Sequence, residues 1–303
     1  MTEGKVSIII PCYNGASTIA QAIRGVLNQT YRPIELILVN DGSTDGSESV
    51  ITGMQEEIEK AGIEFRYCPQ QNMGLGGAIN SGLKQVTGAF LAWCDADDEL
   101  MPQSVEKRVR FLENHPEFGS VSSNAVQFRN CEGRDQLLEL ATTDVKTNSN
   151  SDQFLPMLLG KSLFCSGCHL VKTEVFRESH GGMEIYPARH GQNWQMLLPV
   201  YYTSKHAFIN EPMYKYRTDD SSMSSQVVAM PFKQFYKRQN EYVLMVQKTL
   251  DQIQRMPSHE KRTYIRMFKK RVHIQNLDVA SVSADLLTRF VWKCIVKLEQ
   301  MMG

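Results

Sequence analysis

The sequence predicts an α/β fold built on a doubly wound, mostly parallel sheet. Three short runs of β-branched and other apolar residues, at 6–10, 34–39 and 90–94, have the length and composition of strands buried on both faces. Segments with helical spacing of apolar residues separate these runs, and this alternation is typical of parallel βαβ units. A helical region is predicted to follow at the C-terminal end.

The other elements are predicted from the same periodicities and from turn and capping residues. Ser17 is predicted as the N-cap of a first helix over residues 17–28. The polar stretch 142–152 predicts a mobile loop, and residues 199–202 form an apolar link without a clear assignment. Further helices are expected at 48–60, from 72 onward, and at 103–114, 154–159, 232–250, 259–274 and 284–302. Further strands are expected at 63–67, 119–128 and 207–217, the last as a pair interrupted by Pro212.

Composition excludes several broad classes. The chain has 33 basic and 33 acidic residues, so its overall charge does not favour a nucleic acid as partner. Among the seven cysteines, only Cys165 and Cys168 have a paired spacing, and no second pair completes a zinc site. We therefore expect reduced, structural thiols, as in a cytoplasmic protein. No apolar run reaches the roughly 18 residues of a membrane span, which predicts a soluble chain.

The strand at 90–94 ends in acidic residues, among them Asp95 and Asp97. Ligands of open α/β sheets bind beyond the carboxyl ends of the strands. Two carboxylates one residue apart suit Mg²⁺ or Mn²⁺, which take oxygen ligands from carboxylates and from a substrate's phosphates. A solvated acidic turn that starts the next helix is the alternative interpretation of this motif.

Two other predicted strands also end in polar residues that suit a nucleotide. Tyr13 and Asn14 follow the first strand, and Asp41 follows the second. Each motif alone is explained by packing or by a turn, but a parallel sheet places all three strand ends along one edge. An aromatic ring, a carboxylate and a metal-binding pair together suit a nucleoside diphosphate. No P-loop sequence is present, and the glycines at 74–77 match a dinucleotide fingerprint only weakly.

Four motifs in this order and spacing resemble the nucleotide-sugar half of glycosyltransferase family 2, whose members have the GT-A fold. The resemblance covers roughly residues 5–115. The motifs are Pro11-Cys12-Tyr13-Asn14, the run 39–45 with Asp41, Asn72 and Gly74 leading to Asn80, and Asp95-Ala96-Asp97-Asp98.

The resemblance implies a role for most of these residues. Tyr13 would stack on the base, and Asp41 would bind the base or the ribose. Asp95 would reach the ribose, or the metal through water, and Asp97 would ligate the Mn²⁺ or Mg²⁺ that bridges the diphosphate. The remaining nucleotide-sugar residues would be Pro11, Asn14, Asn72, Gly74, Asn80 and Ala96.

Residues 161–200 are similar to the acceptor half of the same family. Gly167 and Cys168 lie in a stretch similar to the strand and turn beneath the acceptor, and Trp194 either supports an acceptor sugar or packs in the core. The family usually has Glu-Asp where this chain has Gln192-Asn193, and that Asp is the usual catalytic base. A carboxamide does not take up a proton at neutral pH, so the base is left open.

Three interpretations of this departure remain. His190 is the base, with Gln192 and Asn193 orienting the acceptor; or a carboxylate of Glu184, Asp219 or Asp220 takes that role. The third is that the protein binds a sugar nucleotide without efficient transfer.

The C-terminal helices are rich in basic residues, bunched at 261–271. They are expected either to pack as a small subdomain, to touch an anionic membrane where a lipid-linked acceptor resides, or to form a homo-oligomer. The predicted organisation is a GT-A domain at 1–225, with its nucleotide-sugar part at 5–115 and its acceptor side at 116–225. A helical region follows at 226–303.

The function expected from these observations is that of an inverting, metal-dependent glycosyltransferase. It would move a sugar, from a UDP-sugar rather than another donor, to a hydroxyl of a cell-surface glycan precursor in polysaccharide biosynthesis. It would work in the cytoplasm, with peripheral contact at the inner face of the plasma membrane as an open alternative. A silent sugar-nucleotide-binding module and a nucleotidyltransferase are the alternative functions.

Overall fold

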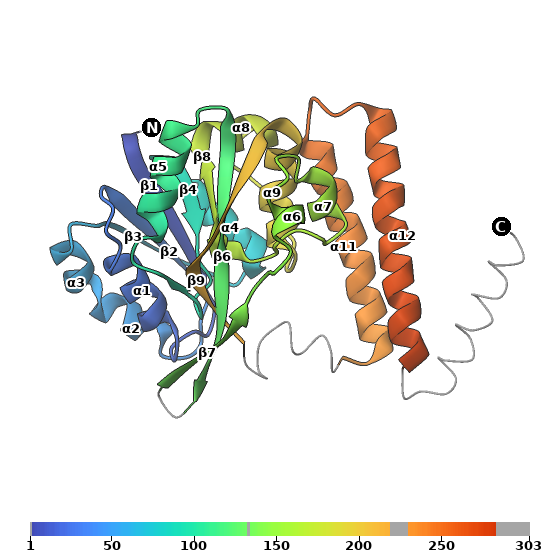
Figure 1. The fold of residues 1–303 in the computed structure, drawn as a ribbon. Helices are drawn as coiled ribbons and strands as arrows, with labels where there is room; N and C mark the ends of the chain where they lie inside the picture. Colours follow the sequence, from blue (N-terminus) through green and yellow to red (C-terminus); the bar gives the residue numbers. More distant parts are fainter. Residues whose placement is uncertain (1, 132–133, 219–229, 283–303) are drawn as a thin grey trace, which may run out of the picture.

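The computed structural model of the chain describes residues 2–131, 134–218 and 230–282. Its centre is a nine-stranded sheet flanked by helices, and two long helices stand beside it (Figure 1). The strands run in the order β3-β2-β1-β4-β8-β6-β9-β5, with β7 paired to β6. The predicted α/β class is confirmed.

The first four strands in this order are parallel and carry the site-bearing loops at their carboxyl ends. They are β1 (Thr2–Cys12), β2 (Ile34–Asp41), β3 (Glu64–Gln70) and β4 (Gly88–Trp93). The register aligns Ile8 of β1 with Leu36 of β2 and with Ala92 of β4. The helices between them are α1 (Ile19–Leu27), α2 (Ser47–Gly53), α3 (Gln55–Lys60) and α4 (Gly74–Leu83).

The second half of the sheet mixes parallel and antiparallel pairs. Its strands are β5 (Glu99–Leu100), β6 (Phe118–Cys131), β7 (Arg134–Leu140), β8 (His169–Lys172) and β9 (Lys205–Arg217). β8 is antiparallel to β4 and β6, whereas β9 runs parallel to β6. The helices here are α5 (Ser104–Asn114), α6 (Val145–Asn148), α7 (Phe154–Leu158), the 3₁₀ turn η1 (Ser166–Cys168), α8 (Thr173–His180) and α9 (Gln192–Thr203).

The C-terminal helices α11 (Phe232–Gln252) and α12 (Ser258–Val282) stack on α9, with α11 between α9 and α12 (Figure 1). Adjacent residues of β1 face opposite cores: Ile8 and Ile10 point to the core under α1 and α5, and Ile9 to the core under α4 and α9. That second core also contains Met245 of α11 and Phe268 of α12. Both long helices therefore share a core with the sheet. None of the described helices combines the length and apolarity that crossing a bilayer requires.

Several local predictions were wrong. Thr18, not Ser17, holds the N-cap position of α1, and the predicted helix at 48–60 is broken at Met54, whose side chain is buried. Residues 199–202, which had no clear assignment from the sequence, belong to α9. The predicted pair of strands at 207–217 is one strand, β9, which absorbs Pro212 through a register shift against β6. The expected helix at 284–302 lies outside the described residues.

The polar stretch 142–152, predicted to be a mobile loop, forms the short helix α6 and hydrogen-bonded turns on either side of it. The Asp144 carboxylate caps α6 by accepting from the Thr147 backbone N–H at 3.0 Å, and Asn148 is buried. The Asn148 side chain also accepts from the Leu163 N–H at 2.7 Å. Asx-type capping, which the composition of a loop does not reveal, orders this segment.

Three buried histidines predict a pH-dependent stability. Burial lowers the pKa of His169 and of His180 to about 4 and holds that of His206 well below its usual range. These rings stay neutral in the folded chain but take up protons in the unfolded chain below about pH 6.5. Their contribution to stability is therefore present above pH 6.5 and is lost as the pH falls below that value.

We predict that in His206→Gln the free energy of unfolding falls less steeply as the pH drops below 6.5. One fewer proton is taken up on unfolding, which lowers the slope by about 1.4 kcal/mol per pH unit. Ser120 and Ser122 each place a hydroxyl 2.9 Å from a ring nitrogen of His206, so the variant also loses stability at pH 7.5. Urea unfolding at pH 7.5, 6.0 and 5.0 measures both effects. The exposed His259→Gln is the matched control, and an unchanged slope in His206→Gln would contradict this account.

Candidate functional site

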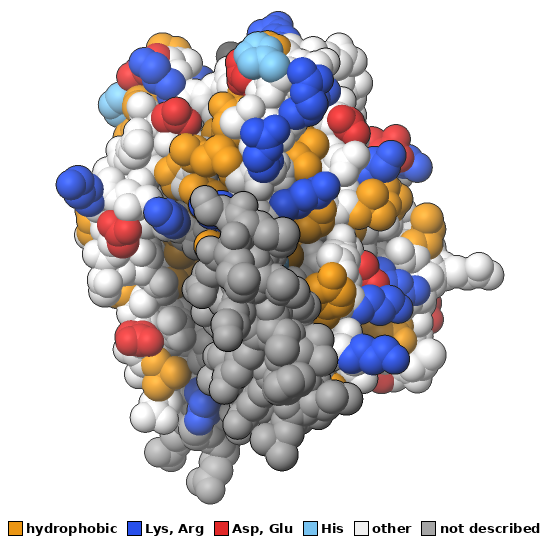
Figure 2. Space-filling model, turned by 90° about the vertical axis from the view of Figure 1, so that its right-hand side faces the viewer, with side chains coloured by type: hydrophobic (Ala, Val, Ile, Leu, Met, Phe, Trp, Pro, Cys, Tyr) orange, Lys and Arg blue, Asp and Glu red, His pale blue; other side chains and the backbone are white. Residues whose placement is uncertain are grey.

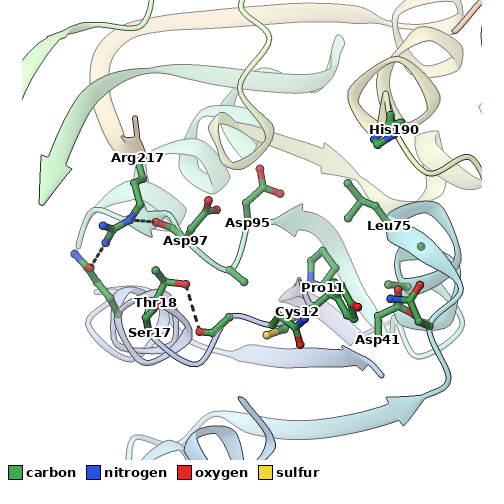
Figure 3. A pocket seen from close by; sticks show the side chains of 18 of the residues that line it. Pro11, Cys12, Ser17, Thr18, Asp41, Leu75, Asp95, Asp97, His190 and Arg217 are labelled. Atoms are coloured by element: carbon green, nitrogen blue, oxygen red, sulfur yellow. Dashed lines mark hydrogen bonds between the residues drawn. The ribbon is translucent and has the colours of Figure 1, made fainter. Parts of the chain in front are cut away.

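A cleft of about 910 Å³ opens where β1, β2 and β4 end (Figure 3). Sequence-predicted residues from all three strand ends line it, together with residues of α4 and of the segment before α9. Those predicted residues are Pro11, Tyr13, Asn14, Asp41, Asn72, Gly74, Asp95, Ala96, Asp97 and His190. The expectation that the strand ends converge on one site therefore holds for these residues.

The turn after β1 is fixed to the turn after β2. Asn14 adopts a positive φ of 52°, and its side-chain oxygen accepts from the Thr44 N–H at 2.8 Å. Its own N–H donates to the Ser43 hydroxyl at 3.0 Å. Tyr13 is thereby presented with 54% of its surface exposed, at the wall of the cleft. An exposed ring on a tied turn is free to stack on a flat ligand.

Asp41 is almost completely buried at the end of β2 but reaches the cleft. One of its oxygens accepts from the Gln70 side chain at 2.7 Å and from the Met73 N–H at 2.8 Å. Gly42 follows with φ of 71°, and a Cβ there would stand 2.7 Å from the Asn72 backbone nitrogen. The turn therefore requires glycine, and it brings Asp41 close to the 72–74 segment.

The loop after β4 carries three carboxylates in different surroundings. Asp95 is partly buried and accepts from the Ser166 hydroxyl at 2.5 Å. Burial and the neighbouring Asp97 raise the pKa of Asp95 to about 6. Asp98 is buried, where it accepts from the Tyr214 hydroxyl and from the Arg217 N–H, both at 2.8 Å. Desolvation and the two neighbouring carboxylates raise the pKa of Asp98 well above its usual range.

Asp95 and Asp97 fit a hard divalent cation. Both line the cleft, and Asp97 is exposed. Burial first and the charge of Asp97 second raise the pKa of Asp95, and a bound cation would offset the repulsion between the two carboxylates. The described residues hold no group of three or more acidic, His or Cys side chains that could bind a metal. Mg²⁺ and Mn²⁺ do not require one, since Mg²⁺ in particular is held by one or two carboxylates, waters and substrate phosphates.

Two arginines in the cleft were not predicted from the sequence. Arg217, at the end of β9, donates from Nε to the Asp97 backbone carbonyl at 3.0 Å and from a terminal nitrogen to the Gln21 side chain at 2.9 Å (Figure 3). Its guanidinium also lies 4.9 Å from the centre of the Phe128 ring. Arg189 lines the opposite part of the cleft, against Gly74. Both belong to segments without a motif, so only the fold places them here.

The glycines of α4 allow the segment before α9 to approach the cleft. The Gly76 N–H donates to the Ala188 carbonyl at 3.0 Å, and a Cβ at Gly76 would lie only 2.6 Å from that oxygen. Asn80, predicted as a nucleotide-sugar residue, instead exchanges hydrogen bonds with the backbone of Ile185 at 2.8 and 2.9 Å and does not line the cleft. Asn80 therefore fastens the segment that carries Arg189 and His190.

The predicted acceptor residues are buried. Gly167 and Cys168 lie in η1 beneath Tyr214, and a Cβ at Gly167 would come 1.9 Å from Tyr214 Cε2. Trp194 is 6% exposed, donates from Nε1 to the Met157 carbonyl at 2.9 Å and packs among aromatic rings. Of the two interpretations of Trp194, this structure shows the packing one, and an acceptor contact stays a prediction. Gly167 supports the site from below, by leaving room for Tyr214.

The sequence offers four candidates for the base: His190, Glu184, Asp219 and Asp220. His190 lines the cleft, and burial with two nearby arginines lowers its pKa. Its Nδ1 is buried and has no hydrogen-bond partner among the described residues. Asn193 is 5% exposed in the first turn of α9, and neither Gln192 nor Asn193 lines the cleft. Of the alternative carboxylates, Glu184 is exposed and does not line the cleft, and Asp219 and Asp220 lie outside the described residues.

The arrangement of a mostly parallel sheet with a carboxylate-lined cleft at the strand ends is that of the GT-A fold. A family model described as glycosyl transferase family 2 matches residues 7–179. The chain belongs to this family.

Named relatives match parts of the chain. An uncharacterized glycosyltransferase of Rickettsia bellii is 41% identical over 107 residues, which is 35% of this chain and 15% of that protein. One from Nostoc sp. is 36% identical over 139 residues, 46% of this chain and 41% of the relative. The glycosyltransferase GlyA of Streptococcus pneumoniae is 25% identical over 232 residues, 74% of this chain and 32% of GlyA. The chain thus spans less than half the length of these relatives.

Solved structures share the fold at low sequence identity. The structure of Staphylococcus aureus TarS 1–349 in complex with UDP-GlcNAc has a TM-score of 0.67 at 15% identity, covering 95% of this chain and 78% of that one. The mannosyltransferase PcManGT from Pyrobaculum calidifontis, in complex with GDP-Man and Mn²⁺, has a TM-score of 0.56 at 16% identity, covering 97% and 79%. These likenesses confirm the predicted GT-A architecture.

We predict that Gly167→Ala destabilises the protein by about 1–3 kcal/mol, because the added methyl group overlaps the buried Tyr214 ring. Urea unfolding at pH 7.5 measures the loss. Gly53→Ala in α2 is the matched control, since a methyl group added there would meet nothing within 4 Å, and it should be neutral or stabilising by up to about 1 kcal/mol. Equal stabilities of the two variants would contradict the packing described for η1.

Proposed function

We propose that the protein is an inverting, metal-dependent glycosyltransferase that uses a nucleotide-sugar donor, with a UDP-sugar preferred. The observation that carries the proposal is the convergence of Tyr13, Asp41 and the Asp95–Asp97 pair on one cleft at the strand ends. Family membership and the nucleotide-sugar complexes of structures with the same fold support it. The proposed acceptor is a hydroxyl of a cell-surface glycan precursor. We propose that the enzyme adds the sugar to this precursor in the cytoplasm.

The cleft offers a contact for each part of the donor. Tyr13 stacks on the base, and Asp41 accepts a hydrogen bond from the base or the ribose. Asp97, with Asp95 directly or through water, would hold Mn²⁺ or Mg²⁺, which when bound neutralises charge on the leaving diphosphate. Arg217 lies beside these carboxylates and adds a permanent positive charge on the same side.

The reaction is a single displacement at the anomeric carbon. The acceptor oxygen forms a bond to that carbon, the bond from carbon to the diphosphate oxygen breaks, and its electron pair leaves with the diphosphate. The acceptor proton passes to a base. We assign this role to His190, because it lines the cleft and its lowered pKa keeps the ring neutral and able to accept a proton at pH 7.

Two other functions give different products. A silent sugar-nucleotide-binding module, which Gln192-Asn193 keeps open, would bind UDP-sugar and release no UDP. A nucleotidyltransferase would form pyrophosphate from a nucleoside triphosphate and a sugar phosphate, but the turn at Pro11–Gly15 lacks the Gly-rich, Lys- or Arg-bearing loop that this chemistry favours. Incubation with UDP-GlcNAc, Mn²⁺ and a candidate acceptor, assayed for UDP, separates the transferase from the silent module. A second incubation with a nucleoside triphosphate and a sugar phosphate, assayed for pyrophosphate, tests the nucleotidyltransferase.

We predict that Mn²⁺ no longer raises the UDP affinity of Asp97→Asn, because the variant removes an anionic oxygen from the metal site. In the presence of Mn²⁺ the variant should bind UDP at least about tenfold more weakly than the wild type. Isothermal titration of UDP with Mn²⁺ and with a chelator measures this gain. Asp251→Asn, an exposed Asp on α11 away from the cleft, is the control and should bind as the wild type does. If Asp97→Asn keeps the metal-dependent gain, the donor site is misassigned.

We predict that His190→Ala abolishes sugar transfer, while Asn193→Ala leaves it largely intact. In the wild type, kcat should fall as the pH drops through the lowered pKa of His190, because the protonated ring no longer accepts the acceptor's proton. The assay is UDP release with acceptor, together with UDP affinity as a check that the donor site is unchanged. The reverse pattern, with transfer lost only in Asn193→Ala, rules out His190 as the base.

A further inference from the structure

Charge is distributed very unevenly along this electrically balanced chain. Residues 231–282, which contain α11 and α12, include eleven Lys and Arg against four Asp and Glu. They carry a formal charge of +7, and the rest of the chain carries −7, since the total is zero. The two long helices therefore form the positive pole of the protein.

On α12 the exposed cations share one side. Successive residues of a helix are rotated by about 100°, so Arg262, Arg266, Lys269 and Lys270 fall within an arc of roughly 100°. All four are exposed. The buried residues Phe268 and Val272 lie on the opposite side, against the core.

Other charges of the helix face elsewhere. The Glu260 carboxylate accepts from the Tyr202 hydroxyl at 2.9 Å, and Arg271 lies with its guanidinium 5.2 Å from the Trp194 ring. Within the described part of the chain, none of the four exposed cations forms a salt bridge. Lys60, Lys107 and Arg110, by contrast, each pair with a glutamate. Among the residues that the structure describes, the exposed side of α12 is thus a row of positive charge without acidic partners.

We propose that this row, which we call the basic face of α12 (Arg262, Arg266, Lys269 and Lys270), binds the anionic surface of a lipid bilayer. Each Lys or Arg near such a surface is attracted to it, and the attractions of neighbouring cations add. None of the four residues lines the cleft, so this contact is independent of the donor site.

The shape of the surface favours a bilayer over a polymer chain. Among the described elements α12 is the outermost, beyond α11, and it is straight over its length (Figure 1). Figure 2 views this side and shows a run of Lys and Arg side chains above the grey atoms, with hydrophobic side chains between them. Ile274, one turn beyond Lys270, is 47% exposed and adds an apolar contact at the interface. A flat membrane surface can touch a straight row of this kind along its whole length.

The test is co-sedimentation of the full chain with vesicles of phosphatidylcholine alone or with one quarter phosphatidylglycerol. The wild type should bind the anionic vesicles, release in 0.5 M salt and leave the neutral vesicles unbound. The variant R262Q/R266Q/K269Q/K270Q should lose about tenfold or more of its partitioning. These side chains are exposed, so its melting temperature should match that of the wild type.

A control variant removes the same charge elsewhere: K60Q/K84Q/K146Q/K205Q changes four exposed lysines outside α12. The proposal predicts that it binds anionic vesicles nearly as well as the wild type. Equal losses in both variants would show attraction by net charge alone and overturn the proposal. Binding to soluble polyphosphate without binding to vesicles, or equal binding to neutral vesicles, would also overturn it. UDP affinity, measured in parallel, reports separately on the proposed donor site.

Discussion

Three carboxylates within four residues, at Asp95, Asp97 and Asp98, set the constraint on which the site depends. Their mutual repulsion would open the loop after β4 unless other elements held it. The Tyr214 hydroxyl and the Arg217 backbone N–H, both of β9, donate hydrogen bonds to the Asp98 carboxylate at 2.8 Å. The Ser166 hydroxyl of η1 donates to the Asp95 carboxylate. The last strand of the sheet and the 3₁₀ turn thereby fix an acidic loop that the fourth strand supplies.

This arrangement explains why the second half of the chain matters to a cleft whose motifs lie in the first half. Arg217 bonds the Asp97 carbonyl and stacks near Phe128, so the end of β9 both shapes the loop and faces the cleft. Gly167 leaves space for the Tyr214 ring, and Asn80 anchors the segment that brings His190 over the opposite wall. In the proposed function Tyr13, Asp41 and Asp97 contact the donor, while Tyr214, Gly167 and Asn80 hold the surrounding segments in place.

The fold was predictable where strands are buried on both faces. Ile8, Ile9 and Ile10 belong to cores on opposite sides of the sheet, so an uninterrupted apolar run was the correct signal for β1. β7 was not predicted, because its leucines at 137, 138 and 140 are exposed and show no alternation of burial. The break at Met54 and the capped turn at Asp144 depend on local hydrogen bonds that periodicity does not report.

The site was predictable only in part, for a related physical reason. Parallel strand ends converge by topology, so Tyr13, Asp41 and the Asp95–Asp97 pair could be grouped from the sequence. Arg217 and Arg189 could not, since each follows a segment whose position is set by packing across the whole sheet. The two interpretations of Trp194 could not be separated from the sequence, because a motif gives the position of a residue in the chain but not the direction of its side chain.

The most direct test of the central claim is a crystal structure with UDP and Mn²⁺, with the ion located by its anomalous scattering. The account predicts one manganese ion, coordinated by the Asp97 carboxylate and by diphosphate oxygens, with the uracil ring stacked against Tyr13. A nucleotide bound at another edge of the sheet, or a manganese ion without Asp97 among its ligands, would contradict it.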